Sequence, residues 1–446
     1  MTSDTSKSSL SVSKNNEVFH TVVIQPVLTG KTDENKLSKS SLVETVGLAK
    51  AIGLKVLTDR IINIRNPSPA SLFGSGTIND FKRIISNLSP DLIIIGMTLS
   101  PIQQRNLERE WQVKVIDRTA LIIEIFGNRA RTREGVLQVD LAALSYQRSR
   151  LVRSWTHLER QRGGAGFLGG PGESQLEIDR RLIDKRISKL KQQLEQVKRT
   201  RGLHRKARNK IPLPIVSLVG YTNAGKSTLF NLLTQSDVIA EDMLFATLDP
   251  TMRALKLPSG QKVILSDTVG FIQELPTHLI AAFRSTLEEV IAADLVLHIR
   301  DAAHPESDRQ RDNVNLILTE LFNGKELSSE NVPPIVEVYN KIDLLDDEQR
   351  EYIRNQTGRY PGFIALSSLS GEGCPGLIEK IYQIINVNHN VIDVDIPITD
   401  GATLAWLYEN GNIIERRDKR MSSHLKVQLS PKNETLFMRR KITHSK

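Results

Sequence analysis

Short apolar runs alternate with amphipathic stretches over the first third of the chain. Three runs rich in Val and Ile have the character of buried strands: residues 22–24, 92–95 and 113–116. Two stretches carry apolar side chains at the spacing of a helix: residues 41–51 and 101–110. This alternation predicts a small α/β domain with a mostly parallel sheet over residues 18–135.

Two heptad patterns follow this region. The first comprises Leu137, Leu141, Leu144, Arg148, Leu151, Trp155 and Leu158. The second comprises Ile183, Ile187, Leu190, Leu194 and Val197. Residues 163–172 between them are rich in glycine and cannot continue a helix. We therefore predict a helical-hairpin linker over residues 136–210, with two antiparallel helices joined along these seams and a glycine-rich tip.

The tip contains the spacing G-x-G-x-x-G at Gly164, Gly166 and Gly169. A dinucleotide site requires this motif directly after a strand. Here it follows a polar, Arg-rich helix, so we interpret it as a loop.

Strand and helix patterns alternate again in the second half of the chain. Five buried-strand runs occur there: residues 215–219, 263–265, 295–299, 335–339 and 363–366. They predict a doubly wound α/β domain over residues 211–390. Residues 391–446 combine a short helical stretch with strand-like runs and predict a small α+β domain. Residues 1–17 are rich in Ser, Lys and Asn and predict a disordered tail.

The composition is that of a water-soluble chain of several domains. A length of 446 residues exceeds what one compact core holds. No apolar run approaches the roughly 18 residues that a membrane-spanning helix needs. The single cysteine, Cys374, excludes an internal disulfide and a cysteine-cluster metal site. We expect a cytoplasmic protein with no membrane span.

The net charge of +9 is distributed unevenly. Residues 145–210 contain 18 basic and 6 acidic residues, which gives +12. Residues 211–390 contain 14 basic and 24 acidic residues, which gives −10. A basic block of this kind predicts contact with nucleic acid or another anionic surface; a solvated helix face is the alternative.

A phosphate-binding motif follows the strand run 215–219. Residues 220–227 have the pattern G-x-x-x-x-G-K-S and precede a helical stretch. In this context we expect Lys226 to reach the β- and γ-phosphates and the Ser227 hydroxyl to ligate Mg²⁺. The backbone N–H groups around the phosphates would come from Gly220, Tyr221, Thr222, Asn223, Ala224 and Gly225.

Three later segments specify the nucleotide as GTP. They are Asp267-Thr268-Val269-Gly270, Asn340-Lys341-Ile342-Asp343 and Ser367-Ser368-Leu369, each near the end of a predicted strand. Asp267 is expected on the Mg²⁺ side, and the Gly270 amide beside the γ-phosphate. The Asp343 carboxylate can accept hydrogen bonds from both N1–H and the 2-amino group of guanine, which adenine cannot offer. Such buried hydrogen-bond demands reject a wrong ligand by about 10⁴-fold. Main-chain amides of the Ser367–Leu369 segment are expected behind the base.

The switch region lies between the phosphate loop and Asp267. Phe245, Ala246, Thr247, Leu248 and Asp249 are predicted to line the nucleotide. Thr247 is the predicted second Mg²⁺ ligand, through its hydroxyl, and Thr251 is the alternative. A purely structural turn is the other interpretation, because Asp-Pro starts turns. Lys226, Thr247 and Gly270 are the predicted catalytic residues.

Two further positions bear on hydrolysis. Phe271 follows Gly270, where many GTPases place a Gln that orients the attacking water, so we expect slow intrinsic hydrolysis that a partner stimulates. Asn223 occupies the fourth position of the phosphate loop. That position matches GTPases in which the Asn helps to seat K⁺, so K⁺ is a second candidate ion. The alternative is that Asn only tolerates the backbone of this loop.

Together these residues resemble the HflX family of translational GTPases, within the Obg-HflX group. Residues 170–181, Gly-Pro-Gly-Glu-Ser-Gln-Leu-Glu-Ile-Asp-Arg-Arg, are similar to the linker signature of the family. Residues 166–169 depart from it, because an Arg is expected shortly before Gly170. The resemblance covers nearly the whole chain and implies the same four-part order of domains.

The resemblance implies binding of GTP and GDP and of the large ribosomal subunit with its RNA. It also implies the separation of stalled ribosomes into subunits, notably under stress. We expect a monomer whose basic hairpin contacts ribosomal RNA, with Phe167 as a residue that stacks on a base and Trp155 in the helix seam. The alternative function is a GTP-gated RNA-binding or assembly factor without splitting activity. A signalling GTPase would have no evident use for the basic hairpin.

The assignment of Asp343 generates a specific prediction. Asp343→Asn should weaken GTP binding and favour xanthosine nucleotides, because the amide can donate where xanthine presents a carbonyl. Fluorescence titrations with GTP and XTP measure both affinities. Unchanged GTP affinity in the variant would contradict the assignment of the base site.

Overall fold

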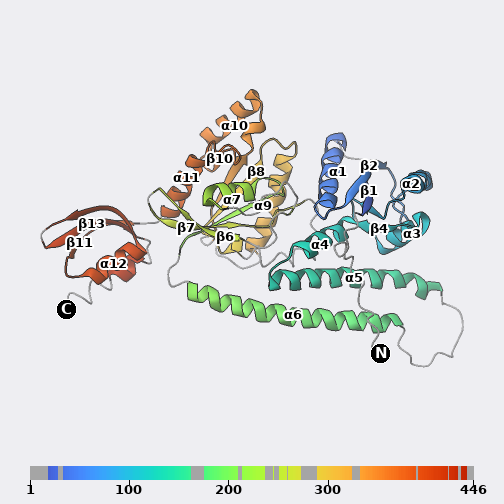
Figure 1. Ribbon diagram of the computed structural model, residues 1–446, viewed down its shortest axis with the longest axis horizontal. Coiled ribbons are helices and arrows are strands. Elements are labelled where there is room, and N and C mark those ends of the chain that lie inside the picture. Colours follow the sequence, from blue (N-terminus) through green and yellow to red (C-terminus); the bar gives the residue numbers. More distant parts are fainter. Residues whose placement is uncertain are drawn as a thin grey trace. The chain divides into compact units, whose positions relative to one another are not determined.

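The computed structural model describes most of the chain (Figure 1). The described residues are 19–28, 34–161, 175–208, 213–236, 245, 251–258, 260–272, 289–323, 332–387, 390–419, 421–429 and 433–438. They belong to two compact units. The first comprises the described residues of Met1–Gly202, Ala240–Asp249 and Val269–Thr286; the second comprises those of Leu203–Ile239, Pro250–Thr268 and Leu287–Lys446.

The N-terminal sheet is parallel, as the sequence predicts. Its strands are β1 (His20–Leu28), β2 (Lys55–Ile64), β3 (Leu92–Ile95) and β4 (Lys114–Asp117), in the order β2-β1-β3-β4. The accompanying helices are α1 (Glu34–Lys50), α2 (Ser75–Leu88), α3 (Pro101–Trp111) and α4 (Arg118–Arg129). The central strand β3 is buried along its whole length, as a strand covered on both faces must be.

The Asp117 side chain joins this sheet to the first long helix. Asp117 is fully buried and caps α4 by accepting a hydrogen bond from the Ala120 amide at 2.9 Å. It also accepts from the Leu99 amide at 3.1 Å, the Tyr146 hydroxyl at 2.7 Å and Arg150 Nη2 at 2.6 Å. Burial and the nearby Asp117 raise the pKa of Tyr146, so its hydroxyl stays protonated as a donor. This carboxylate therefore fixes the base of the helical hairpin.

The predicted hairpin consists of α5 (Arg133–Gln161) and α6 (Gln175–Arg208), which lie side by side in Figure 1. Ile187 and Leu194 of the predicted seam are buried. Arg148, the polar member of the first heptad pattern, pairs with Asp184 of α6 at 2.7 Å. The glycine-rich tip with Phe167, and the side chain of Trp155, lie outside the described residues.

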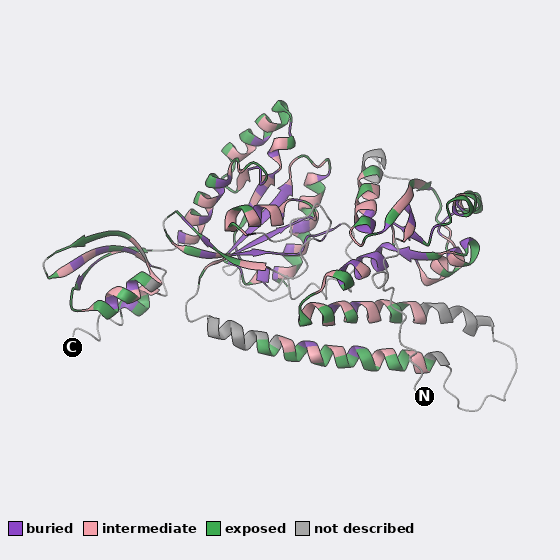
Figure 2. Ribbon diagram, viewed as in Figure 1, coloured by how far each residue is buried: buried purple, intermediate pink, exposed green. Residues whose placement is uncertain are grey.

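The second sheet is mixed and belongs to the predicted doubly wound domain. Its strands are β5 (Ile215–Gly220), β6 (Thr251–Lys256), β7 (Lys262–Asp267), β8 (Leu295–Asp301), β9 (Ile335–Asn340) and β10 (Phe363–Ala365). The order is β10-β9-β8-β5-β7-β6, and β6 alone among these strands is antiparallel to its neighbour. Figure 2 shows the central strands buried and the outer helix faces exposed.

Helices surround this sheet. They are α7 (Lys226–Thr234), α9 (Ser307–Asn323), α10 (Asp347–Arg359) and α11 (Cys374–Asn386), with the short 3₁₀ helix η2 (Ile342–Leu344) after β9. Phe230 of α7 and Leu377 of α11 pack into one core cluster with the strand residues Leu218, Leu297 and Val338. These two helices therefore cover one face of the sheet, and the carboxyl ends of the strands stay available for a ligand.

The C-terminal part is a small α+β domain, as predicted. It contains β11 (Asn390–Pro397), α12 (Gly401–Asn410), β12 (Asn412–Asp418) and β13 (Ser422–Leu429). The antiparallel sheet has the order β11-β13-β12, and Leu407 of α12 packs with Val427 and Phe437. Within the ranges that the structure describes, every helix is too short or too polar to cross a bilayer.

The contacts of Asp117 generate a prediction about local stability. Tyr146→Phe removes one donor to a buried carboxylate and should lower the opening free energy of α4 and α5 by about 2 kcal/mol. Native-state hydrogen exchange of the amides in these helices measures that energy. Ser149→Ala on the exposed face of α5 is the matched control and should change it by less than about 0.5 kcal/mol. Equal effects of the two variants would contradict the role of Asp117.

Candidate nucleotide site

The phosphate loop connects β5 to α7, and both of its glycines have conformations that only glycine accommodates. Gly220 has φ +148°, and a Cβ there would lie 2.1 Å from the Ile299 carbonyl oxygen. Gly225 has φ +88°, and a Cβ there would lie 2.2 Å from Asn340 Nδ2. The loop must therefore pass close to β8 and to the end of β9, and glycine permits this approach.

The Asn340 side chain joins the phosphate loop to the two predicted base-binding segments. Asn340 is fully buried at the end of β9. Its Nδ2 donates to the Ala224 carbonyl at 2.8 Å and to Ser368 Oγ at 3.0 Å, and its Oδ1 accepts from the Ser368 amide at 2.9 Å. One amide thus fixes the distance between the phosphate loop, Asn340–Asp343 and Ser367–Leu369. We call these contacts the Asn340 junction.

Lys226 is the first residue of α7 and is buried. Its Nζ donates to the carbonyls of Gly220 at 3.1 Å and Tyr221 at 2.7 Å. Burial lowers the pKa of Lys226 to about 8, against the opposing effect of the Asp267 carboxylate. A phosphate group would supply the negative charge that this ammonium lacks.

Ser227 and Asp267 lie together on the side of the predicted Mg²⁺. Ser227 Oγ donates to Asp267 Oδ2 at 2.7 Å, and Asp267 is fully buried at the end of β7. A hydroxyl and a carboxylate in contact form an all-oxygen donor set, which suits Mg²⁺. Thr251, the alternative ligand, is the first residue of β6 and pairs with Asp267 across the strands. Thr247 lies outside the described residues, so its ligand role stays a prediction.

The predicted base-binding residues gather at the carboxyl end of β9. Lys341 has a left-handed backbone with φ +64°, which turns the chain into η2, where Asp343 is half-buried. Ser367 and Ser368 are buried, whereas the Leu369 side chain is 80% exposed. Within the first unit, Val269, Gly270 and Phe271 are each buried.

Among the predicted switch residues, the structure describes Phe245. Its ring is buried and packs edge-on against Phe126 of α4, with ring centroids 4.8 Å apart. The Phe245 ring is therefore covered by protein, and the place of this residue beside the nucleotide stays a prediction. Ala246, Leu248 and Asp249 lie outside the described residues.

Sequence reasoning missed two charged residues at the end of β8. Arg300 is buried and donates to Glu337 at 2.8 Å and to Asp308 at 2.6 Å. Asp301 pairs with Lys341 at 2.8 Å. Their position in the sequence could have indicated them, because both directly follow a buried apolar run and therefore lie at the carboxyl edge of the sheet.

Comparison with known proteins identifies the family. Four family models match successive segments: GTP-binding GTPase N-terminal over residues 39–127, GTP-binding GTPase Middle Region over 129–208, 50S ribosome-binding GTPase over 215–341 and HflX C-terminal domain over 353–446. The GTPase HflX of Magnetococcus marinus is 49% identical over 87% of this chain and 88% of its own length. The chain belongs to the HflX family of GTPases. The Escherichia coli GTPase HflX is 41% identical over 82% of this chain and 84% of its own length.

Membership of the HflX family establishes the general activity. The protein is a P-loop GTPase that binds guanine nucleotide and hydrolyses GTP. This confirms the resemblance, the fold class and the enzyme class that the sequence predicts.

The buried Lys226 generates a prediction about pH. Phosphate favours the ammonium form and raises the pKa of Lys226 above its value of about 8 in the free protein. Above that pH, binding of GDP should therefore take up close to one proton, and the affinity should fall by up to about tenfold per pH unit. Calorimetry in buffers of different ionisation heat, at pH values below and above the pKa, measures the uptake.

Lys226→Arg is the control, because guanidinium stays charged throughout this range. The variant should show no proton uptake that depends on this residue. Equal uptake by the wild type and the variant would contradict the proposed origin of the effect.

Proposed function

We propose that this chain binds the large ribosomal subunit, separates stalled ribosomes into subunits and uses GTP hydrolysis for its release. The observation that carries the proposal is the separation of charge, with +12 on residues 145–210 and −10 on residues 211–390. A model described as 50S ribosome-binding GTPase matches residues 215–341 and supports the same partner. Such a role would place the protein in the cytoplasm, and we propose that it acts there as a monomer.

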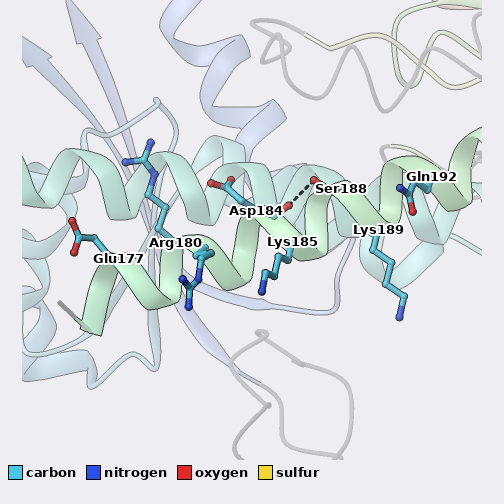
Figure 3. Close-up of a pocket in the computed structure, with 8 residues that line it drawn as sticks. Glu177, Arg180, Asp184, Lys185, Ser188, Lys189 and Gln192 are labelled. Atoms are coloured by element: carbon cyan, nitrogen blue, oxygen red, sulfur yellow. Dashed lines mark hydrogen bonds between the residues drawn. The ribbon is translucent and has the colours of Figure 1, made fainter. Parts of the chain in front are cut away.

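The basic residues of α6 form an exposed surface. Figure 3 shows Arg180, Lys185 and Lys189 projecting from this one helix, beside Glu177 and Asp184. Arg180, Lys185 and Lys189 are exposed, and so is Arg181, which lines the same shallow pocket along α6. Cations repeated along successive turns suit the regularly spaced phosphates of an RNA strand, and their contacts release counterions. This surface supports RNA as the partner of the hairpin.

At the nucleotide site, we propose that Ser227 and Asp267 hold Mg²⁺, with Asp267 acting directly or through water. The ion would neutralise charge on the phosphate oxygens. Lys226 would contact the β- and γ-phosphates, Thr247 would complete the Mg²⁺ ligands, and the Gly270 amide would face the γ-phosphate. The Asp343 carboxylate would select guanine, and amides of Ser367–Leu369 would support the base.

The hydrolysis step would depend on a partner. Phe271 is 5% exposed and carries no group that could orient water. Asn223 is exposed and has φ +61°, a left-handed conformation that Asn tolerates well. This conformation gives Asn223 a structural reason for its position, and K⁺ beside it remains part of the proposal. We expect K⁺ to support faster hydrolysis than Na⁺.

Sucrose-gradient profiles test the proposed function. Ribosomes incubated with the protein and GTP should shift from whole particles to subunits. An alternative outcome is binding to ribosomes that stay whole, which would show a GTP-gated RNA-binding or assembly factor and contradict the splitting activity.

The exposed surface of α6 generates a prediction for ribosome binding. Reversing Arg180, Arg181 and Lys185 to Glu should weaken binding and reduce the slope of log affinity against log salt by about 2. GTP affinity should not change. Co-sedimentation with large subunits over a range of salt measures the slope.

The matched control reverses three exposed basic residues of the GTPase region, Lys256, Arg354 and Arg359, with the same change in net charge. It should leave the slope nearly unchanged. If the α6 variant kept the wild-type slope, the basic block would be only a solvated helix face.

A further inference from the structure

We infer that Asp301 is a positioning residue for the guanine base, because it holds the Lys341 side chain across the base site before the nucleotide binds. The inference rests on the proposed base-binding role of Asn340–Asp343. Nothing in the motif pattern points to Asp301, which lies 40 residues earlier in the chain than Lys341.

Strand pairing brings the two residues together. Asp301 is the last residue of β8, and Asn340 is its partner across the β8–β9 ladder. The Ala302 amide donates to the Asn340 carbonyl at 2.9 Å and extends this pairing beyond the strand. Lys341 follows immediately, so the position of Asp301 beside it is set by the sheet.

The Asp301 carboxylate is oriented by its own loop. Oδ1 accepts a hydrogen bond from the Ala303 amide at 3.0 Å, which leaves Oδ2 to face Lys341 Nζ at 2.8 Å. The side chains of Asp301 and Lys341 are only 16% and 23% exposed. A fixed acceptor and limited exposure distinguish this ion pair from the surface pairs that contribute little.

The ion pair fixes an otherwise mobile side chain. A lysine side chain has many accessible rotamers, and a ligand must offset the entropy that is lost if it orders the side chain on binding. With Nζ fixed at Asp301, the methylene groups of Lys341 run along the carboxyl edge of the sheet between the ends of β8 and β9. They offer an apolar surface to a flat base while the charge stays on the carboxylate. The ion pair with Asp301 at 2.8 Å is the contact that places the Lys341 side chain there.

Asp301→Asn separates this role from a structural one. The Asn side chain retains a carbonyl oxygen that can accept from the Ala303 amide, so the turn after β8 is kept. It loses the negative charge that holds Lys341. Stopped-flow displacement of a fluorescent GDP should show dissociation accelerated by about fivefold.

Asp308→Asn is the matched control, because Asp308 is 80% exposed and pairs with Arg300 instead of Lys341. It should leave the dissociation rate unchanged. In a Lys341→Met background, which keeps the methylene groups and removes the ammonium, Asp301→Asn should have no further effect.

A wild-type dissociation rate in Asp301→Asn would overturn the inference. An equal acceleration in the presence and absence of the Lys341 ammonium would overturn it too, because Asp301 would then act through the turn alone. Guanine selectivity and ribosome splitting by the wild-type protein test the proposed function separately, so either failure can be recognised.

Discussion

The nucleotide site depends on one buried amide. Asn340 has no exposed surface, and its side chain contacts both the Ala224 carbonyl of the phosphate loop and Ser368. Gly225 must be glycine because this amide lies against it. A buried amide without its hydrogen-bond partner lowers the stability of the folded protein, so the three segments hold one another in place. The segments that we propose for the phosphates and for the base of one nucleotide thereby form a single connected structure.

A second buried polar group, the Asp117 carboxylate, anchors the base of the helical hairpin. Asp117 accepts hydrogen bonds from Tyr146 and Arg150 of α5, so this helix is fixed to the N-terminal sheet through a carboxylate that has no exposed surface. The helix α6, which carries the basic surface, is joined to α5 by the apolar seam and by the ion pair between Arg148 and Asp184. The positive charge that we propose for RNA binding therefore lies on a helix that is held in place by α5.

The sequence predicts those parts of the fold whose signal is local. Apolar runs locate β3, β5 and β8, the last two with one polar residue inside the run, and glycine followed by Lys226-Ser227 locates the phosphate loop. The edge strands β2 and β6 were not predicted, because charged residues such as Asp59 and Arg253 interrupt their apolar pattern. Edge strands need burial on fewer sides, so their sequences carry less of the periodic signal.

Local sequence patterns do not predict contacts between residues that lie far apart in the chain. Asp117 and Arg150 are 33 residues apart, and Asn340 and Ala224 are 116 apart. The motif Asn340–Asp343 predicts a base site, yet the link from Asn340 to the phosphate loop appears only when the strands are placed side by side. The ion pair between Asp301 and Lys341 likewise follows from the pairing of β8 with β9.

The ratio of GDP affinity to GMP affinity tests the role of the Asn340 junction most directly. In the wild type this ratio measures the contribution of the β-phosphate, which the phosphate loop binds. Asn340→Ala, in protein that circular dichroism shows to be folded, should weaken binding of both nucleotides and also lower the ratio, because the loop loses its support at Ala224. A weaker affinity with an unchanged ratio would show that Asn340 acts at the base alone and would contradict this account.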